Sequence, residues 1–347
     1  MSPRPIPSEL LPWALTVLQS SDAGESPESA LTLVTGDASN RRYFRLVCAD
    51  KSYIVADAPP ETEKNSEFVA IHRVLSNAGV RVPHLFAADI DRGYLLLEDL
   101  GDHSLLPALN ENSVDAWYEK AQGILRKMAA VDLGSVDAAY DHALFSEELS
   151  RFGEWFVTGL LNYTLSDSER EIISRFSSVL LESALEQPQV LVHRDFHSRN
   201  LMILEDGELV IIDFQDAVRG PITYDIASLL KDCYIRWPQA QVEAWALAYK
   251  RQLDGWVNLQ GLSDETFLRW FDAMALQRHI KVLGTFARLY LRDGKAAYLA
   301  DLPMVLGYIH ETLDRYAVQE AAFAEFSEWF AETLAPRIAL QSWSASS

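Results

Sequence analysis

The chain has 347 residues, more than one ordinary hydrophobic core accommodates, so its length favours two domains or one large domain with two lobes. Hydrophobic residues make up 49% of the chain, which excludes an intrinsically disordered protein. The 50 acidic and 30 basic residues give a formal net charge of -20. Because such a surface repels phosphate backbones and anionic lipid headgroups, we expect neither nucleic acid nor a membrane surface as a partner.

The cysteines and the N-terminus also limit the class of protein. Cys48 and Cys233 show no CxxC spacing and no histidine spacing suited to zinc, so we expect neither a disulfide framework nor a zinc site. The first ten residues lack the basic and apolar regions of a signal peptide, and no apolar stretch is long enough to span a membrane. We therefore expect a cytoplasmic protein, with no obligate protein partner indicated.

The first hundred residues favour a small antiparallel sheet with one helix. The helical spacing of Phe68, Ile71 and Leu75 predicts a helix over 62–77 that ends before Gly79. Alternating or β-branched apolar runs bounded by turn residues predict five strands: 31–34, 41–48, 53–56, 84–89 and 93–97.

From about residue 110 the apolar residues recur at long helical periods instead. The only two strands indicated in this part, 201–204 and 209–212, form a short hairpin around Asp206 and Gly207. We therefore expect an α+β protein of two lobes. The expected division is a nucleotide-covering N-lobe at 1–97, a hinge at 98–101 and a mainly helical C-lobe at 102–347.

A polar segment between apolar runs carries the candidate catalytic residues. Residues 193–200 read HRDFHSRN, and Asp213 follows thirteen residues later at the end of a predicted strand. Phosphoryl transfer needs such a set, because the protein mainly positions the nucleophile and holds Mg²⁺ on the nucleotide phosphates. Asp195 is the candidate base, and Asn200 and Asp213 are the candidate metal ligands. In the alternative interpretation these residues only cap turns and a helix, which explains one motif but not both.

These motifs resemble the H-R-D-x-x-x-x-N and D-F-G pair of the kinase fold, and the resemblance implies a protein-kinase-like architecture that uses ATP and Mg²⁺. Gln215 replaces the glycine, and no A-P-E segment follows, so a protein substrate is disfavoured. The following segment, 220–229, reads GPITYDIASL and resembles the aminoglycoside phosphotransferase and choline kinase-like family. Small molecules are the substrates of that family.

Four further segments look like the bacterial anomeric kinases of N-acetylmuramate and N-acetylglucosamine, which recycle cell-wall sugars: 36–45, 53–60, 96–101 and 277–284. This resemblance implies transfer of the γ-phosphoryl group of ATP to an anomeric hydroxyl. Two alternatives remain. One is another kinase of the same fold that acts on an aminoglycoside or an amino alcohol, cations that the negative charge would attract. The other is a nucleotide-binding pseudokinase that regulates a partner.

For the nucleotide, the kinase resemblance indicates a phosphate-covering loop and a hinge that contacts adenine. The candidate contacts are Gly36, Ser39, Asn40, Arg45, Glu98 and Leu100. Ala56 occupies the position where most kinases have lysine, so we expect an arginine among Arg41, Arg42 and Arg45 to bind the phosphates, with Lys64 as the next candidate. Glu67 is either the partner glutamate of that position or an exposed helix residue.

The sequence gives fewer indications of the residues that bind the phosphoryl acceptor. Arg278 is the candidate for binding a carboxylate or the developing phosphate of the acceptor. A helix-surface ion pair with Asp272 or Glu265 is the alternative for Arg278. His197, inside the polar segment, is expected to support the substrate site and not to bind a metal, because no further ligands lie at suitable spacing.

Overall fold

The computed structural model describes residues 4–19, 30–34, 40–48 and 51–344. The chain divides into two compact units, one formed by Met1–Pro107 with Asn200–Asp216 and the other by Ala108–Arg199 with Ala217–Ser347. The hairpin expected in the C-lobe therefore belongs to the first unit, which also extends beyond the expected boundary at residue 97. Backbone hydrogen bonds join the hairpin to this unit. The Leu105 N–H donates to the Leu201 carbonyl, and the Ile211 N–H donates to the Arg81 carbonyl.

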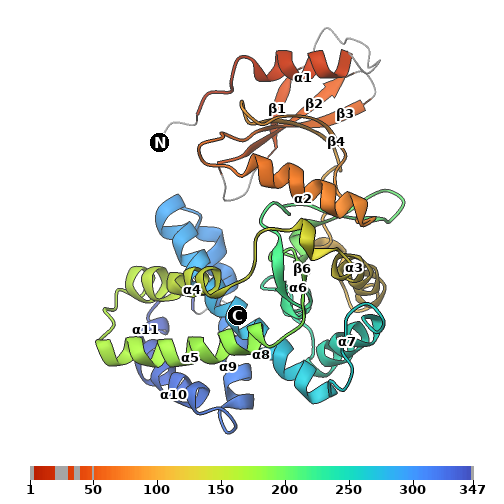
Figure 1. Ribbon diagram of the computed structural model, residues 1–347. Coiled ribbons are helices and arrows are strands. Elements are labelled where there is room, and N and C mark those ends of the chain that lie inside the picture. Colours follow the sequence, from red (N-terminus) through yellow and green to blue (C-terminus); the bar gives the residue numbers. More distant parts are fainter. Residues whose placement is uncertain (1–3, 20–29, 35–39, 49–50, 345–347) are drawn as a thin grey trace. The chain divides into compact units, whose positions relative to one another are not determined.

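The predicted five-stranded antiparallel sheet of the first unit is confirmed, with the order β1-β2-β3-β5-β4 (Figure 1). β5 pairs with β3, so only the first three strands follow one another as a simple meander. The one predicted helix is α2, Asn65–Asn77, which begins three residues later than expected. The strands are β1 Leu31–Val34, β2 Arg42–Cys48, β3 Lys51–Asp57, β4 Leu85–Asp89 and β5 Tyr94–Glu98.

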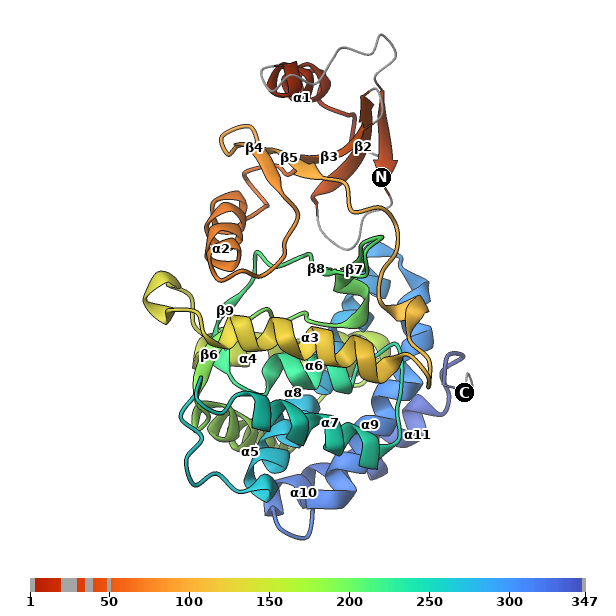
Figure 2. The same cartoon turned by 90° about the vertical axis from the view of Figure 1, so that its right-hand side faces the viewer.

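A second helix in this unit, α1 at Leu10–Gln19, was not predicted from the sequence. Leu10, Ala14 and Leu18 recur every four residues and bury one face of α1 against the sheet residues Phe44 and Leu46. Pro7 lies before the helix, and its carbonyl accepts a hydrogen bond from the Leu10 N–H. Figures 1 and 2 show the sheet between α1 and α2.

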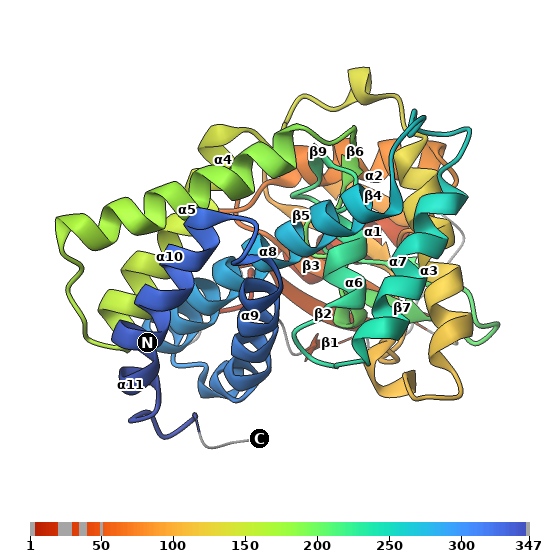
Figure 3. The ribbon, with the colours of Figure 1, turned by 90° about the horizontal axis from the view of Figure 1, so that it is seen from below.

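The second unit is built around α8, Asp264–Asp293, whose middle third is almost continuously buried. It packs against α4, α5, α6, α7 and α9 (Figure 3). A two-stranded antiparallel pair, β6 Gln189–Val192 with β9 Val218–Pro221, accompanies the helices. The helices are α3 Val114–Ala129, α4 His142–Arg151, α5 Asp167–Leu185, α6 Tyr224–Leu230, α7 Gln239–Gln252, α9 Leu302–Tyr316, α10 Ala321–Trp329 and α11 Ala335–Ile338.

Helix α4 continues directly into a π-helical segment, Phe152–Leu160. This junction lies against Gly284 of α8. A Cβ atom at Gly284 would lie 2.3 Å from the carbonyl carbon of Arg151 and 2.6 Å from the Phe152 nitrogen. Only glycine therefore allows the two backbones to approach this closely.

Across the described ranges, from residue 4 to residue 344 with their gaps, no helix is both long enough and apolar enough to cross a membrane.

Candidate active site

The segment that follows β6 is held in place by two carboxylates. Asp225 of α6 accepts hydrogen bonds from the backbone N–H groups of His193, at 2.6 Å, and Arg194, at 3.0 Å. Asp232 accepts from both the N–H and the hydroxyl of Ser198. Arg194 has φ 77°, a left-handed backbone conformation that is unfavourable for arginine and that these contacts stabilise. Strain of this kind is concentrated at functional sites, which supports the catalytic interpretation of the segment.

Asp195, the candidate base, lies in the second unit with 41% of its side chain exposed. The Lys281 ammonium of α8 is 3.9 Å from its Oδ1 atom. Desolvation favours the neutral acid, but the charges of Lys281, His197, Arg194 and Arg278 outweigh it and hold the pKa of Asp195 below its ordinary value. Asp195 is therefore ionised at neutral pH and can accept a hydrogen bond from a hydroxyl group.

Behind this segment lies a fully buried carboxylate, Glu148 of α4. Its oxygens accept hydrogen bonds from Lys281 at 2.9 Å and from Gln277 and Tyr140 at 3.0 Å, and the Arg194 guanidinium also contacts it. Burial disfavours the charged form of Glu148, but the two cations lower its pKa to about 2. We call Glu148, Lys281 and Arg194 the Glu148 cluster.

Neither Glu148 nor Lys281 was a candidate from the sequence. Lys281 belongs to the segment 277–284 that carries the resemblance to the anomeric kinases, and it lies four residues after Gln277. That spacing places both side chains on one face of α8, toward Glu148. The helical spacing of Gln277 and Lys281 was therefore visible in the sequence, whereas their partner on α4, Glu148, was not.

The two candidate metal ligands lie in the first unit, at the same end of the hairpin formed by β7, Leu201–Ile203, and β8, Leu209–Ile211. The Ile212 N–H donates to the Asn200 carbonyl at 3.1 Å, so pairing continues for one residue beyond the two strands. Asp213 is exposed and has φ 64°, the second strained backbone position among the candidate residues. An amide oxygen and a carboxylate oxygen at one hairpin end fit the preferences of Mg²⁺.

Arg41 lies beside this hairpin end. One of its terminal nitrogens donates to the Gln215 side chain at 3.4 Å, and Gln215 donates to Asp213 Oδ1 at 2.8 Å. The Arg41 Nε atom is 3.7 Å from a Glu63 oxygen. Glu67 is exposed on α2, whereas Glu63 forms an ion pair with Arg41. With Ala56 buried in β3, Arg41 is the candidate arginine that Gln215 links to Asp213.

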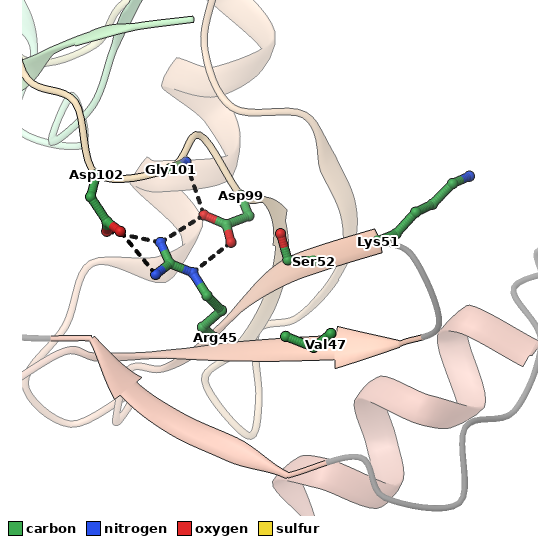
Figure 4. Close-up of a pocket in the computed structure, with 7 residues that line it drawn as sticks. All are labelled: Arg45, Val47, Lys51, Ser52, Asp99, Gly101 and Asp102. Atoms are coloured by element: carbon green, nitrogen blue, oxygen red, sulfur yellow. Dashed lines mark hydrogen bonds and ion pairs between the residues drawn. The ribbon is translucent and has the colours of Figure 1, made fainter. Parts of the chain in front are cut away.

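Figure 4 shows where the structure places Arg45. Its guanidinium points toward Asp99 and Asp102 and donates to both carboxylates, at 2.6 Å from Nε to Asp99 and at 2.9 Å to Asp102. The Gly101 N–H donates to the same Asp99 carboxylate. These ion pairs hold the pKa of Asp102 below its ordinary value, mainly through the hydrogen bond from Arg45. Arg45 thus joins β2 to the segment that follows β5.

The other candidate cations also have acidic partners. Arg42 contacts Asp57, and Lys64 is 2.7 Å from Asp216. Among the candidate nucleotide contacts, Asn40 is exposed and its N–H donates to Glu63 at 3.0 Å. Gly36 and Ser39 lie outside the described residues.

At the expected hinge, the Glu98 carboxylate accepts hydrogen bonds from Arg81 and from the backbone N–H of His84. Leu100 is half-buried. The contact of this segment with adenine stays a prediction.

The acceptor candidates both lie in the second unit. The His197 ring meets the Tyr234 ring edge-on, with ring centres 5.4 Å apart. Arg278 is only 5% exposed, lies 5.7 Å from the centre of the Tyr224 ring, and its Nε atom has no hydrogen-bond partner among the described residues. The alternative of a surface ion pair with Asp272 is not observed, because Asp272 binds the buried Lys231 at 2.9 Å.

Comparison with known proteins identifies the family. The model of the phosphotransferase enzyme family matches residues 30–262. An N-acetylmuramate/N-acetylglucosamine kinase of Pseudomonas putida is 42% identical over 309 residues, which cover 89% of this chain and 90% of the relative.

Solved structures confirm the predicted protein-kinase-like fold. An ethanolamine kinase of Plasmodium vivax aligns over 86% of this chain and 83% of its own, with a TM-score of 0.60 at 12% identity. An ADP-bound aminoglycoside phosphotransferase aligns over 88% and 99%, with a TM-score of 0.56 at 16% identity. The family match covers more than half of the chain and contains Asp195, Asn200 and Asp213. The chain therefore belongs to the phosphotransferase enzyme family.

Proposed function

We propose that this protein is an ATP-dependent kinase that phosphorylates the anomeric hydroxyl of N-acetylmuramate or N-acetylglucosamine. The kinase chemistry rests on one observation, the pairing of Asn200 with Ile212 that brings Asn200 and Asp213 to the same hairpin end. The choice of sugar rests on the 42% identity to the Pseudomonas putida kinase over nine-tenths of the chain.

In this proposal the first unit holds the nucleotide. Asn200 and Asp213 would bind Mg²⁺, which when bound neutralises charge on the nucleotide phosphates. Arg41 would supply the cation that Ala56 cannot, because its planar guanidinium suits phosphate oxygens and Gln215 links it to Asp213. The intact Asp195, Asn200 and Asp213 argue against a pseudokinase.

Asp195 accepts the proton of the acceptor hydroxyl. Its lowered pKa makes it a weak base, so its main contribution is to orient the hydroxyl oxygen for attack on the γ-phosphorus. As the new oxygen–phosphorus bond forms, the bond to the leaving ADP oxygen breaks and the hydroxyl proton moves to Asp195. An anomeric hydroxyl is more acidic than an ordinary alcohol, which suits a weak base.

A panel of acceptors tests the substrate class. ATP consumption is measured with N-acetylmuramate, N-acetylglucosamine, an aminoglycoside, choline and ethanolamine. The methyl glycosides of the two amino sugars are the matched controls, because their anomeric oxygen has no proton to lose. We expect turnover of the free sugars only. Turnover of a methyl glycoside contradicts phosphorylation of the anomeric hydroxyl, and nucleotide binding without turnover of any acceptor favours the pseudokinase.

Replacement of the base tests the mechanism. Asp195→Asn removes the proton acceptor with little change in shape, so kcat should fall about 100-fold or more while nucleotide binding persists. A variant with parental kcat would exclude Asp195 as the base.

A further inference from the structure

Lys281 lies next to the candidate base without occupying the surface of the site. Its side chain is 9% exposed, whereas that of Asp195 is 41% exposed, so the ammonium meets the carboxylate from the protein interior. The same ammonium is 2.9 Å from Glu148 Oε1 and 3.2 Å from the Tyr224 hydroxyl. Glu148 and Tyr224 thereby hold the position of a long, flexible side chain.

The Lys281 ammonium lies at different distances from its two carboxylate neighbours, Glu148 and Asp195. The contact with Glu148 is a charge-assisted hydrogen bond, while 3.9 Å to Asp195 is longer than any hydrogen bond. Lys281 therefore attracts the Asp195 carboxylate without donating to it, and so does not itself take up an acceptor position that a substrate hydroxyl requires. The two carboxylates, Glu148 and Asp195, are balanced in charge by two cations, Lys281 and Arg194.

We infer that Lys281 is a positioning residue, which orients the Asp195 carboxylate for the acceptor hydroxyl by attracting its Oδ1 atom toward the protein interior. This inference rests on the proposed role of Asp195. The lowered pKa of Asp195 agrees with it, since desolvation is opposed first of all by the charge of Lys281. Glu148 acts through Lys281, because its carboxylate anchors the ammonium.

A purely structural role is the competing explanation, in which Lys281 only neutralises the buried Glu148. A second buried lysine in this chain provides a matched control for that structural explanation. Lys231 is also a buried lysine, with 3% of its side chain exposed, and it binds a buried carboxylate, Asp272 of α8, at the same distance of 2.9 Å. Lys231→Met therefore removes a comparable buried ion pair elsewhere in the second unit.

The experiment compares kcat, the KM for ATP and the Tm of the full-length variants. Lys281→Met should lower kcat about tenfold or more with the KM for ATP unchanged, and Lys281→Arg, which keeps the charge, should recover part of the loss. Lys231→Met should lower the Tm at least as much and keep the parental kcat. Equal kcat values for Lys281→Met and Lys231→Met overturn the inference.

Two double variants complete the test. In an Asp195→Asn background, Lys281→Met should cause no further loss of kcat, because there is no base left to orient. A full additional loss there contradicts the inference. Should Lys281→Met alone fail to fold, Glu148→Gln with Lys281→Met removes both charges of the pair. A kcat well below that of Glu148→Gln alone supports the inference, and a kcat equal to it argues against it.

The failure of the inference is distinguishable from that of the proposed function. If Asp195→Asn itself keeps the parental kcat, the assignment of the base is wrong whatever Lys281 does. If Asp195→Asn is inactive while Lys281→Met behaves like Lys231→Met, only the inference fails. Binding of a fluorescent ATP analogue without acceptor gives a readout besides activity and should be unchanged in Lys281→Met.

Discussion

The Glu148 cluster predicts how the stability of this protein depends on pH. Glu148 is fully buried, and its neighbouring cations lower its pKa from an ordinary 4.5 to about 2. A carboxyl group whose pKa is lower in the folded than in the unfolded state stabilises the fold above its unfolded pKa. That stabilisation is lost as the pH falls toward the folded pKa. The relevant window for Glu148 therefore runs from about pH 5 down to about pH 2.

The magnitude follows from the same shift. At 1.36 kcal/mol per pKa unit, a displacement from 4.5 to about 2 corresponds to about 3 kcal/mol of unfolding free energy at neutral pH. Roughly 1 kcal/mol of this is lost by pH 4, because the unfolded carboxyl is then mostly protonated and the folded one is not. A buried group is little screened by solvent, so no large reduction for screening applies.

Glu148→Gln isolates this contribution from the other carboxyl groups of an acidic protein. Urea unfolding of the parent and the variant is measured at pH 7 and at pH 4. The parent should be the more stable at pH 7, and the difference in unfolding free energy should shrink by about 1 kcal/mol at pH 4. A difference that is the same at both pH values would refute the ionised, ion-paired state of Glu148.

Two further predictions concern the first unit. Arg41→Ala should raise the KM for ATP or lower kcat through loss of the phosphate cation. Arg42→Ala, which loses contacts with Asp57 and with the carbonyls of Arg4 and Pro5, is the control in the same steady-state assay. Equal kinetics of the two variants would contradict the role of Arg41 and make Lys64 the next residue to test. Activity should vanish in EDTA and return with Mg²⁺ or Mn²⁺, while Asp213→Ala should stay inactive at every metal concentration. Full activity in EDTA would exclude the metal assignment.

Most of the fold could be predicted from the sequence because its signals are local. Apolar periodicity located the five strands of the sheet and the long helices, and glycine and acidic turn residues marked their ends. The missed helix α1 is only ten residues long, and its buried face consists of just three residues, Leu10, Ala14 and Leu18. The membership of the hairpin in the first unit depends on backbone hydrogen bonds to residues about a hundred positions away, which no local pattern records.

Some residues of the candidate site could likewise be predicted from the sequence, while others could be assigned only from the structure. Asp195, Asn200 and Asp213 are spaced as a motif, so the sequence alone indicated them. The choice among the arginines needed the structure, since Arg41 and Arg45 lie only four residues apart in one short segment and yet contact different groups. Glu148 and Lys281 are 133 residues apart, and only the packing of α4 on α8 makes them partners.

The glycine at position 284 has a consequence for how variation in this protein is interpreted. α4 and α8 touch at two levels, through Lys281 with Glu148 and, three residues further along both helices, through Gly284 with the backbone of Arg151. Because Gly284 has no side chain, the two helices can approach closely at this level, beside the contact of Lys281 with Glu148. Even a methyl group at this position would force the helices apart at a point about 4.5 Å along the axis from Lys281. Given the positioning role inferred for Lys281, a substitution at Gly284 that touches no reacting atom would then alter turnover. A screen for damaging variants that weighs only contacts with the substrate would overlook it.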